Sequence, residues 1–145
     1  MFFKKVLTLS LILSLLPAAS FSQTREEERT QKEDAKIIQD ITEENLQFFL
    51  NKSPLVVLYF YSPRNAESLK MKKILASATI DQNPVIYSIQ IDTNLGLRQT
   101  FKVSELPAVV VLKNRKLLYG LSGYIDDPAV LSDFINQGIQ FSDAP

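Results

Sequence analysis

The chain of 145 residues contains no cysteine and no histidine. Without cysteine it can form no disulfide, and it has no thiolate for nucleophilic catalysis or thiol–disulfide exchange. Without histidine it lacks an imidazole base and the nitrogen ligand that zinc sites commonly use. The chemistry left open to the chain rests on hydroxyls, carboxylates, amides, lysine and arginine.

An excess of charge of one sign is also lacking, because 16 Lys and Arg balance 16 Asp and Glu. A nucleic-acid partner would require a concentrated excess of basic residues. There are only four glycines and no glycine-rich phosphate loop. Asp126, Asp127 and Asp133 lack the spacing of a calcium-binding loop. We therefore expect no nucleic-acid partner, no cofactor and no metal site.

The first 22 residues have the three-part pattern of a secretory signal peptide. Lys4 and Lys5 form a basic start, residues 6–16 are apolar, and small residues precede Gln23. The apolar run is shorter than the roughly 20 residues that span a bilayer. We expect cleavage after Ser22, no stable membrane anchor afterwards, and an exported protein, periplasmic or secreted.

Residues 23–40 form a charged N-terminal arm rich in Glu and Lys. This composition favours helix but offers too little apolar surface to fold alone. We expect a solvated arm that docks through Ile37, Ile38 and Ile41. A homodimer or partner contact through residues 23–40 is the alternative, although the apolar residues do not repeat as heptads.

Residues 41–140 show the alternation of patterns expected for an α/β domain, followed by a tail at 141–145. The strands are predicted as apolar and β-branched runs, and the last two are joined by a tight polar turn. A parallel set that meets an antiparallel hairpin implies a mixed sheet sandwiched by helices. The predicted strands are residues 55–61, 85–91, 108–112 and 117–121.

Capping residues and helical spacing predict four helices in the same region. Thr42 is the expected cap of a helix over 43–50, and Asp92 to Asn94 offer caps for a short helix ending at Phe101. Asp127 before Pro128 opens the last helix. The expected apolar residues of the second helix, over 65–80, are Leu69, Ile74, Leu75 and Ala78, and those of the last helix are Val130, Leu131, Phe134 and Ile135.

In order and spacing, several short segments within residues 41–139 resemble the thioredoxin family. The first is the strand end Tyr59–Pro63 followed by a four-residue window and a helix. The other segments are 90–92, 101–103, 106–107, 112–114 and Gly123. The resemblance implies the thioredoxin-like fold, a mixed central sheet sandwiched by helices.

The redox residues of that family are absent from the matching positions. Asn65 and Ser68 stand where the two active-site cysteines would be, while Tyr59 replaces the buried acid and Ser88 its partner lysine. A carboxamide cannot attack a disulfide, and a serine hydroxyl cannot replace a thiolate in exchange. The resemblance therefore implies a redox-inactive member, and we expect no disulfide oxidoreductase activity and no catalytic residue.

The surface around the positions of the missing redox residues is the candidate binding site. By resemblance, Pro107 matches a cis-proline that lets the preceding backbone pair with an extended peptide, although the sequence leaves the isomer open. Such pairing is the strand-addition mode of recognition. The candidate partner-binding residues are Tyr61, Pro63, Arg64, Leu106, Pro107, Gly123 and Tyr124.

The sequence thus predicts non-covalent binding of a polypeptide partner, as a chaperone-like protein, an adaptor or an assembly factor. We expect Asn65 and Ser68 to act as helix caps. The alternative is a protein or enzyme that binds a small anion or thiol through Ser68 at the helix N-terminus. Scattered surface aromatics without function would explain the same tyrosines.

Overall fold

The structure, a computed structural model, describes residues 37–141. The predicted signal segment at 1–22, most of the charged arm, and residues 142–145 lie outside the described residues. Within the described part, no helix is long and apolar enough to cross a membrane.

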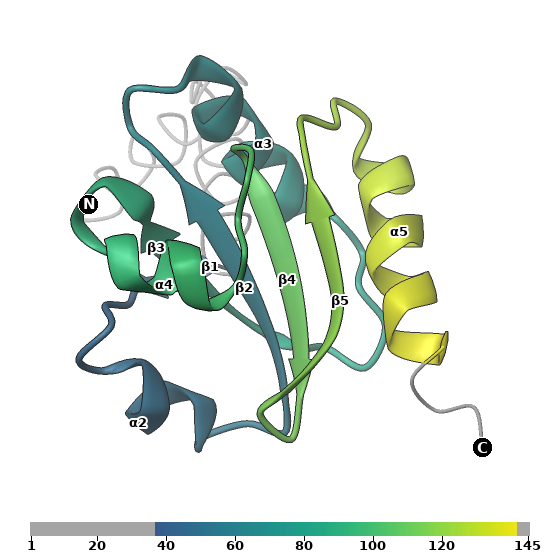
Figure 1. Ribbon diagram of the computed structural model, residues 1–145. Coiled ribbons are helices and arrows are strands. Elements are labelled where there is room, and N and C mark those ends of the chain that lie inside the picture. The colour runs from purple at the N-terminus through teal and green to yellow at the C-terminus, as the bar shows by residue number, and fades with distance from the viewer. Residues whose placement is uncertain (1–36, 142–145) are drawn as a thin grey trace, which may run out of the picture. The chain divides into compact units, whose positions relative to one another are not determined.

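Five strands form one mixed sheet in the order β1-β3-β2-β4-β5. Strands β1 and β2 both run parallel to β3, whereas β4 is antiparallel to β2 and β5 is antiparallel to β4. This confirms the predicted mixed sheet with a terminal hairpin (Figure 1). The strands are β1 (Ile37–Asp40), β2 (Leu55–Tyr61), β3 (Val85–Gln90), β4 (Ala108–Lys113) and β5 (Lys116–Ser122).

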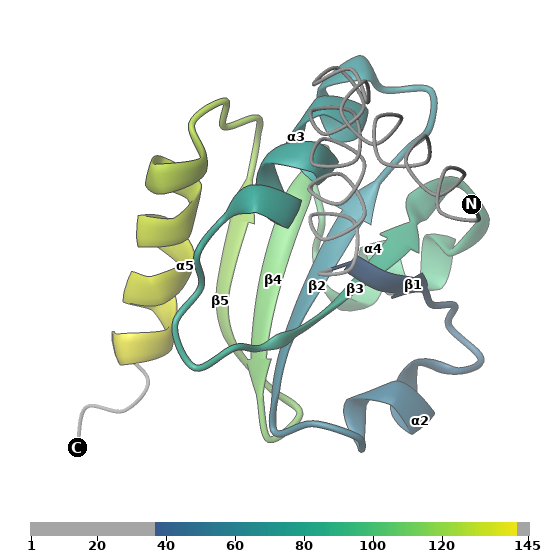
Figure 2. The ribbon, with the colours of Figure 1, turned by 180° about the vertical axis from the view of Figure 1, so that it is seen from behind.

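Helices cover both faces of the sheet (Figures 1 and 2). On one face, α3 and α5 contribute Met71, Leu75 and Leu131 to the core; on the other, α2 and α4 contribute Leu50 and Leu97. The helices are α2 (Leu46–Leu50), α3 (Ala66–Ser77), α4 (Leu95–Thr100) and α5 (Pro128–Phe141), with a 3-10 turn η1 (Ile91–Thr93) before α4.

Strand β2 lies between two core layers, and all seven of its residues are buried. Because successive side chains of a strand point to opposite faces, Leu58 and Phe60 belong to one layer, and Tyr59 and Tyr61 to the other. The unbroken apolar run in the sequence is therefore the central strand, as predicted.

Strand β1 was not predicted. Residues 37–40 belong to the segment that the sequence assigns to a solvated, helix-favouring arm, yet Ile37 pairs with Ile86 and Asp40 with Ser88 in a parallel ladder with β3. The pairing residues are about 50 positions apart, so local sequence does not reveal the partner strand. The helix preference comes from the Glu and Lys residues before position 37, whereas the β-branched Ile37 and Ile38 suit a strand once the edge of β3 is present.

Two predicted helix caps are wrong. Thr42 does not cap α2; its backbone N–H instead donates to Asn45 Oδ1 at 2.8 Å, and the helix begins at Leu46. Asn94 precedes α4 but makes no side-chain cap. Its amide accepts from Glu43 N at 3.0 Å and donates to the Gln90 carbonyl at 2.8 Å. Asn94 therefore stands at the N-cap position of α4, but its side chain joins the segment before α2 to the end of β3.

Helix α5 begins as predicted, because Asp127 Oδ1 accepts from Ala129 N at 2.7 Å. Its buried stripe differs from the prediction. Val130 and Phe134 are 43% and 40% exposed, while the buried apolar residues are Leu131, Ile135 and Ile139. In α3, Leu69 is likewise exposed and Met71 is buried. Leu131 and Ile135 in α5, and Leu75 and Ala78 at α3, are buried as predicted, so each predicted face overlaps the true one in part.

Candidate functional site

The strand register brings three separate loops to one end of the sheet. Phe60 of β2 pairs with Ala108 of β4, which pairs with Ser122 of β5. The turn after β2, the segment before β4 and the loop after β5 therefore all leave the sheet at this end, above the strands in Figure 1. We call this end, formed by residues 62–68, 106–107 and 123–124, the turn end.

Asn65 caps α3, as predicted. Its Oδ1 accepts from the backbone N–H of Ser68 at 2.8 Å, and its backbone is extended, as expected at an N-cap. The backbone N–H of Asn65 donates to the Ser62 carbonyl at 3.1 Å, which closes the turn. The residue that by resemblance stands in place of an attacking cysteine therefore stabilises the helix start.

Ser62 fixes the other side of the turn. Its hydroxyl donates to Asp92 Oδ2 at 2.7 Å and accepts from the backbone N–H of Arg64 at 3.2 Å. Asp92 lies in η1, so this contact joins the turn to the segment that follows β3. Sequence reasoning did not identify Ser62 or Asp92, and no motif in the sequence indicates their contact.

Ser68 is not a cap, in contrast to the prediction. It is the third residue of α3 and fully buried, and its Oγ lies 3.4 Å from the backbone N of Ser62. Its carbonyl oxygen accepts the hydroxyl of Tyr59 at 2.5 Å. A side chain with no exposed surface offers nothing to an external anion or thiol, which weighs against the alternative site at Ser68.

Tyr61 is not on the surface, which corrects its place in the candidate site. It is the last residue of β2, only 6% exposed, and its ring stacks on Tyr59 with 6.1 Å between centroids. Its hydroxyl donates to Asp40 Oδ2 at 2.6 Å. Burial, then the hydrogen bond and the negative charge of Asp40, raise the pKa of Tyr61 above its ordinary range.

The positions of the family's buried acid and lysine carry a different arrangement. Tyr59 and Ser88 pair across β2 and β3. Tyr59 is fully buried, and burial, followed by the neighbouring Tyr61, raises its pKa. The Ser88 hydroxyl donates to Asp40 Oδ1, so the carboxylate of Asp40 accepts from two strands. This carboxylate comes from β1, which explains why sequence reasoning missed it.

Residues 106–107, directly before β4, are held by fewer hydrogen bonds than the turn after β2. The Leu106–Pro107 peptide bond is cis. Pro107 is buried, and its carbonyl accepts the backbone N–H of Gly123 at 2.9 Å, which holds the loop after β5 against it. Gly123 has a φ of +104°, a conformation that favours glycine. No hydrogen bond between described residues uses the backbone of Leu106.

The exposed part of the turn end is small and mixed in character. Pro63 and Arg64 are exposed at the turn, Tyr124 is 36% exposed on the loop after β5, and Leu106 is half-buried against the core. Lys72 of α3 lies nearby with its Nζ 4.7 Å from the centroid of the Tyr61 ring. The structure thus leaves Pro63, Arg64, Leu106, Gly123 and Tyr124 as surface of the predicted site.

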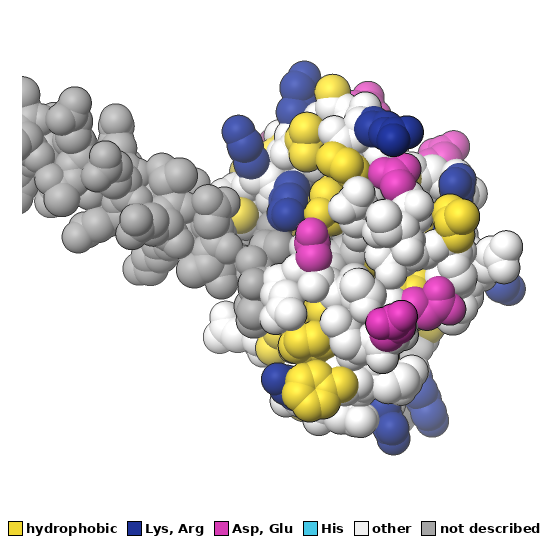
Figure 3. All heavy atoms as spheres, turned by 90° about the vertical axis from the view of Figure 1, so that its left-hand side faces the viewer, with side chains coloured by type: hydrophobic (Ala, Val, Ile, Leu, Met, Phe, Trp, Pro, Cys, Tyr) yellow, Lys and Arg dark blue, Asp and Glu magenta, His cyan; other side chains and the backbone are white. Residues whose placement is uncertain are grey.

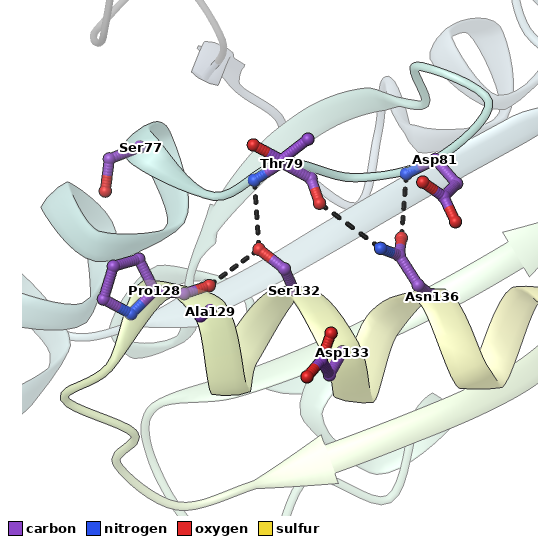
Figure 4. A pocket seen from close by; sticks show the side chains of 8 residues that line it. All are labelled: Ser77, Thr79, Asp81, Pro128, Ala129, Ser132, Asp133 and Asn136. Atoms are coloured by element: carbon purple, nitrogen blue, oxygen red, sulfur yellow. Dashed lines mark hydrogen bonds between the residues drawn. The ribbon is translucent and has the colours of Figure 1, made fainter.

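Two shallow hollows lie away from the turn end. One, of about 470 Å³, lies between the loop after α3 and α5, where Ser132 and Asn136 hydrogen-bond to Thr79 and Asp81 (Figure 4). These contacts fasten the loop to α5. The other, of about 380 Å³, lies between residues 50–54 and the β4–β5 turn.

The surface shows no concentration of one charge on the face drawn in Figure 3, where basic and acidic side chains are interspersed. Among the described residues there is also no group of three acidic side chains that could hold a metal ion.

Comparisons with known proteins identify the fold. No protein-family model and no curated protein matches the sequence. Among solved structures, a thioredoxin variant from Halobacterium salinarum is 17% identical with a TM-score of 0.60, over 70% of this chain and 89% of its own.

Two further thioredoxins are similar to the same extent. The one from Malassezia sympodialis is 17% identical with a TM-score of 0.58, over 70% of this chain and 90% of its own. The one from Schistosoma mansoni is 18% identical with a TM-score of 0.58, over 70% and 94%. The chain has the thioredoxin-like fold, and it has no cysteine with which to perform thiol–disulfide exchange.

Proposed function

We propose that this protein is an exported, redox-inactive thioredoxin-like protein that binds a polypeptide non-covalently, as a chaperone-like protein, an adaptor or an assembly factor. One observation carries the proposal. At the turn end, the backbone of Leu106 makes no hydrogen bond to the other described residues, next to a proline that is held in place by Gly123.

The unpaired backbone of Leu106 suits an extended peptide. A strand that runs alongside Leu106 would pair with its N–H and C=O, and such main-chain bonds give affinity with little sequence preference. Selectivity would come from the neighbouring side chains. Arg64 offers a cation and Tyr124 an aromatic ring, and both residue types are frequent anchors in interfaces.

The hydrogen bonds that hold the turn after β2 support the proposal of non-covalent binding. Asn65 and Ser62 hold the turn through side-chain hydrogen bonds, so the surface is rigid before a partner arrives. A preformed site loses less conformational entropy on binding. Because the chain has no cysteine, it can form no mixed disulfide with a bound polypeptide, which therefore leaves by dissociation.

Site-specific photocrosslinking in the native host tests this function. A photoreactive side chain at position 64 or 124 should capture polypeptide partners that mass spectrometry identifies, and a Leu106→Pro variant, which lacks the backbone N–H, should capture them far less. Position 48, on exposed Phe48 of α2, is the matched control.

The outcome is decisive in either direction. Partners captured at positions 64 and 124 but not at 48 support the proposal. Equal capture at all three positions would reject the turn end as the binding surface. An insulin-reduction assay serves as a second check, since any reductase activity would contradict the prediction that the protein is redox-inactive.

A further inference from the structure

Strand β5 forms an open edge of the sheet. In the described part of the chain, it pairs with β4 only. Since Gly123 N donates to the Pro107 carbonyl, the alternation of an antiparallel ladder turns the backbone groups of Leu121 toward β4 and those of Gly120 and Ser122 outward. From Leu117 to Ser122 the strand has neither a charged residue nor a proline, the usual protections of an exposed edge.

An apolar stripe on α5 is exposed. Val130, Phe134 and Phe141 are 43%, 40% and 79% exposed, although all three are large hydrophobic residues. At 100° per residue, these positions fall within a sector of about 40° on the helix surface. The exposure is therefore concentrated along one line of α5, which we call the α5 stripe.

The α5 stripe lies on the same side as the open edge. On one flank of α5, Ser132 and Asn136 hydrogen-bond to the loop after α3. On the other flank, Gly138 packs so closely on Tyr119 of β5 that an added Cβ would lie 2.6 Å from its ring. The stripe adjoins this second flank, where α5 is the outermost element beside β5 (Figure 1).

Opposite charges lie at the two ends of the same edge. Arg115 and Lys116 are exposed at the start of β5, and Asp126 and Asp127 are exposed in the loop beyond its end. Two copies of β5 placed antiparallel would bring the basic end of each copy to the acidic end of the other. The edge is therefore complementary to itself under a two-fold rotation.

We propose that this edge is a homodimer interface, in which β5 of two copies pair antiparallel about a two-fold axis at Leu121. In this register Gly120 of one copy pairs with Ser122 of the other through the outward backbone groups. Lys116 then lies toward Asp126 of the second copy. The two α5 helices lie side by side on the same face of a continuous sheet and cover each other's stripes.

The oligomeric state of the purified chain tests the proposal. Analytical ultracentrifugation over a concentration series should show a monomer–dimer equilibrium with a dissociation constant in the micromolar range. Phe134→Asp should weaken the dimer by about 100-fold or more, because it places a charge in the apolar contact. Phe48→Asp, at an aromatic residue that is 61% exposed on α2, is the matched control and should leave the equilibrium unchanged.

A charge exchange separates the interface from general effects on folding. Lys116→Glu and Asp126→Lys should each weaken the dimer by about 5-fold to 10-fold, and the double variant should recover most of the affinity. Recovery requires that the two positions face each other across copies, so it cannot arise from a loss of stability.

The absence of native cysteine allows a direct test of the register. In a Leu121→Cys variant, the two sulfurs would face each other across the axis and form an intermolecular disulfide under mild oxidation. Phe48→Cys should remain unlinked. A chain that stays monomeric at about 200 µM, or that dimerises equally in Phe134→Asp, would overturn the proposal. Dimerisation lost only on deletion of residues 23–36 would place the interface in the charged arm and also overturn it.

Discussion

The two halves of the turn end differ in how the chain holds them. The turn after β2 is fastened by side chains, since Asn65 and Ser62 hold the backbone of residues 64–68 and Tyr59 supports it from below. Residues 106–107, directly before β4, are held by one backbone bond from Gly123 to Pro107, and Leu106 has no hydrogen bond to another described residue.

This difference concerns the positions that, by resemblance, would carry a reactive centre. Each position that would serve redox chemistry by resemblance now makes a structural contact: Asn65 caps, and Ser68 and Tyr59 bond beneath the turn. In the second half, the backbone of Leu106 makes no such contact with the other described residues. Side-chain hydrogen bonds therefore hold the first half of the turn end, whereas they do not hold Leu106 in the second half.

Removal of the Tyr59 side chain is expected to destabilise the fold by removing the support beneath the turn after β2. Tyr59→Ala deletes a fully buried ring, its stacking on Tyr61 and its bond to Ser68, so the free energy of unfolding should fall by about 3–5 kcal/mol. Tyr59→Phe, which loses the hydroxyl alone, should cost about 1 kcal/mol. Urea denaturation measures both; equal losses for the two variants would show that the ring packing contributes nothing.

Alkaline pH should lower the free energy of unfolding through Tyr59 and Tyr61. The pKa values of Tyr59 and Tyr61 are raised in the folded protein, so the unfolded chain loses these protons first, near the ordinary value of about 10. The unfolded state then binds fewer protons, and stability falls as pH rises above about 10, by roughly 1 kcal/mol per pH unit for each tyrosine.

Thermal unfolding at a series of pH values from about 9 to 11.5 checks this slope. Tyr61→Phe should make it shallower, because one of the raised groups is gone. A slope that is unchanged in this variant would mean that Tyr61 titrates alike in both states.

Loss of the cap on α3 should lower the free energy of unfolding by a smaller amount than loss of Tyr59. Asn65→Ala removes the acceptor of Ser68 N and should cost about 1 kcal/mol. Ser104→Ala, in the exposed segment before Leu106, should change stability by less than about 0.5 kcal/mol. Chemical denaturation of the two variants side by side would sharpen the comparison; similar costs would abolish it.

Amide hydrogen exchange compares the two halves without altering either. The N–H of Ser68 is hydrogen-bonded to Asn65 and should exchange at least about 10-fold more slowly than the N–H of Leu106. NMR-detected exchange on the native chain gives both rates. Slow exchange at Leu106 in the absence of a partner would mean that its N–H is not available for pairing.

The fold was largely predictable because its strands and helices differ clearly in period. The β2 run, the β4–β5 hairpin and the α5 start at Asp127 follow from local residues alone. Strand β1 could not be predicted, because its four residues follow a charged segment and pair with β3 about 50 residues later. Such pairing depends on the finished sheet edge rather than on local propensity.

The candidate site was less predictable than the fold. The predicted strand already ends at Tyr61, but the proximity of Tyr61 to Pro63 and Arg64 in sequence suggested that its side chain is exposed, whereas its ring is buried. The period of two places Tyr59 and Tyr61 on one face, which is a signal that could have found the error. The contacts of Asp40 and Asp92 join residues 21 and 30 positions apart and have no counterpart in local sequence.

Strand β1 ties the processing of the chain to the integrity of its sheet. A protease that cuts before Ile37 removes only residues outside the described fold. A cut after Asp40 would leave β3 paired with β2 alone, and it would leave Tyr61 and Ser88 without the carboxylate that accepts their hydroxyls. Loss of residues 37–40 would therefore remove an edge strand and the Asp40 carboxylate together.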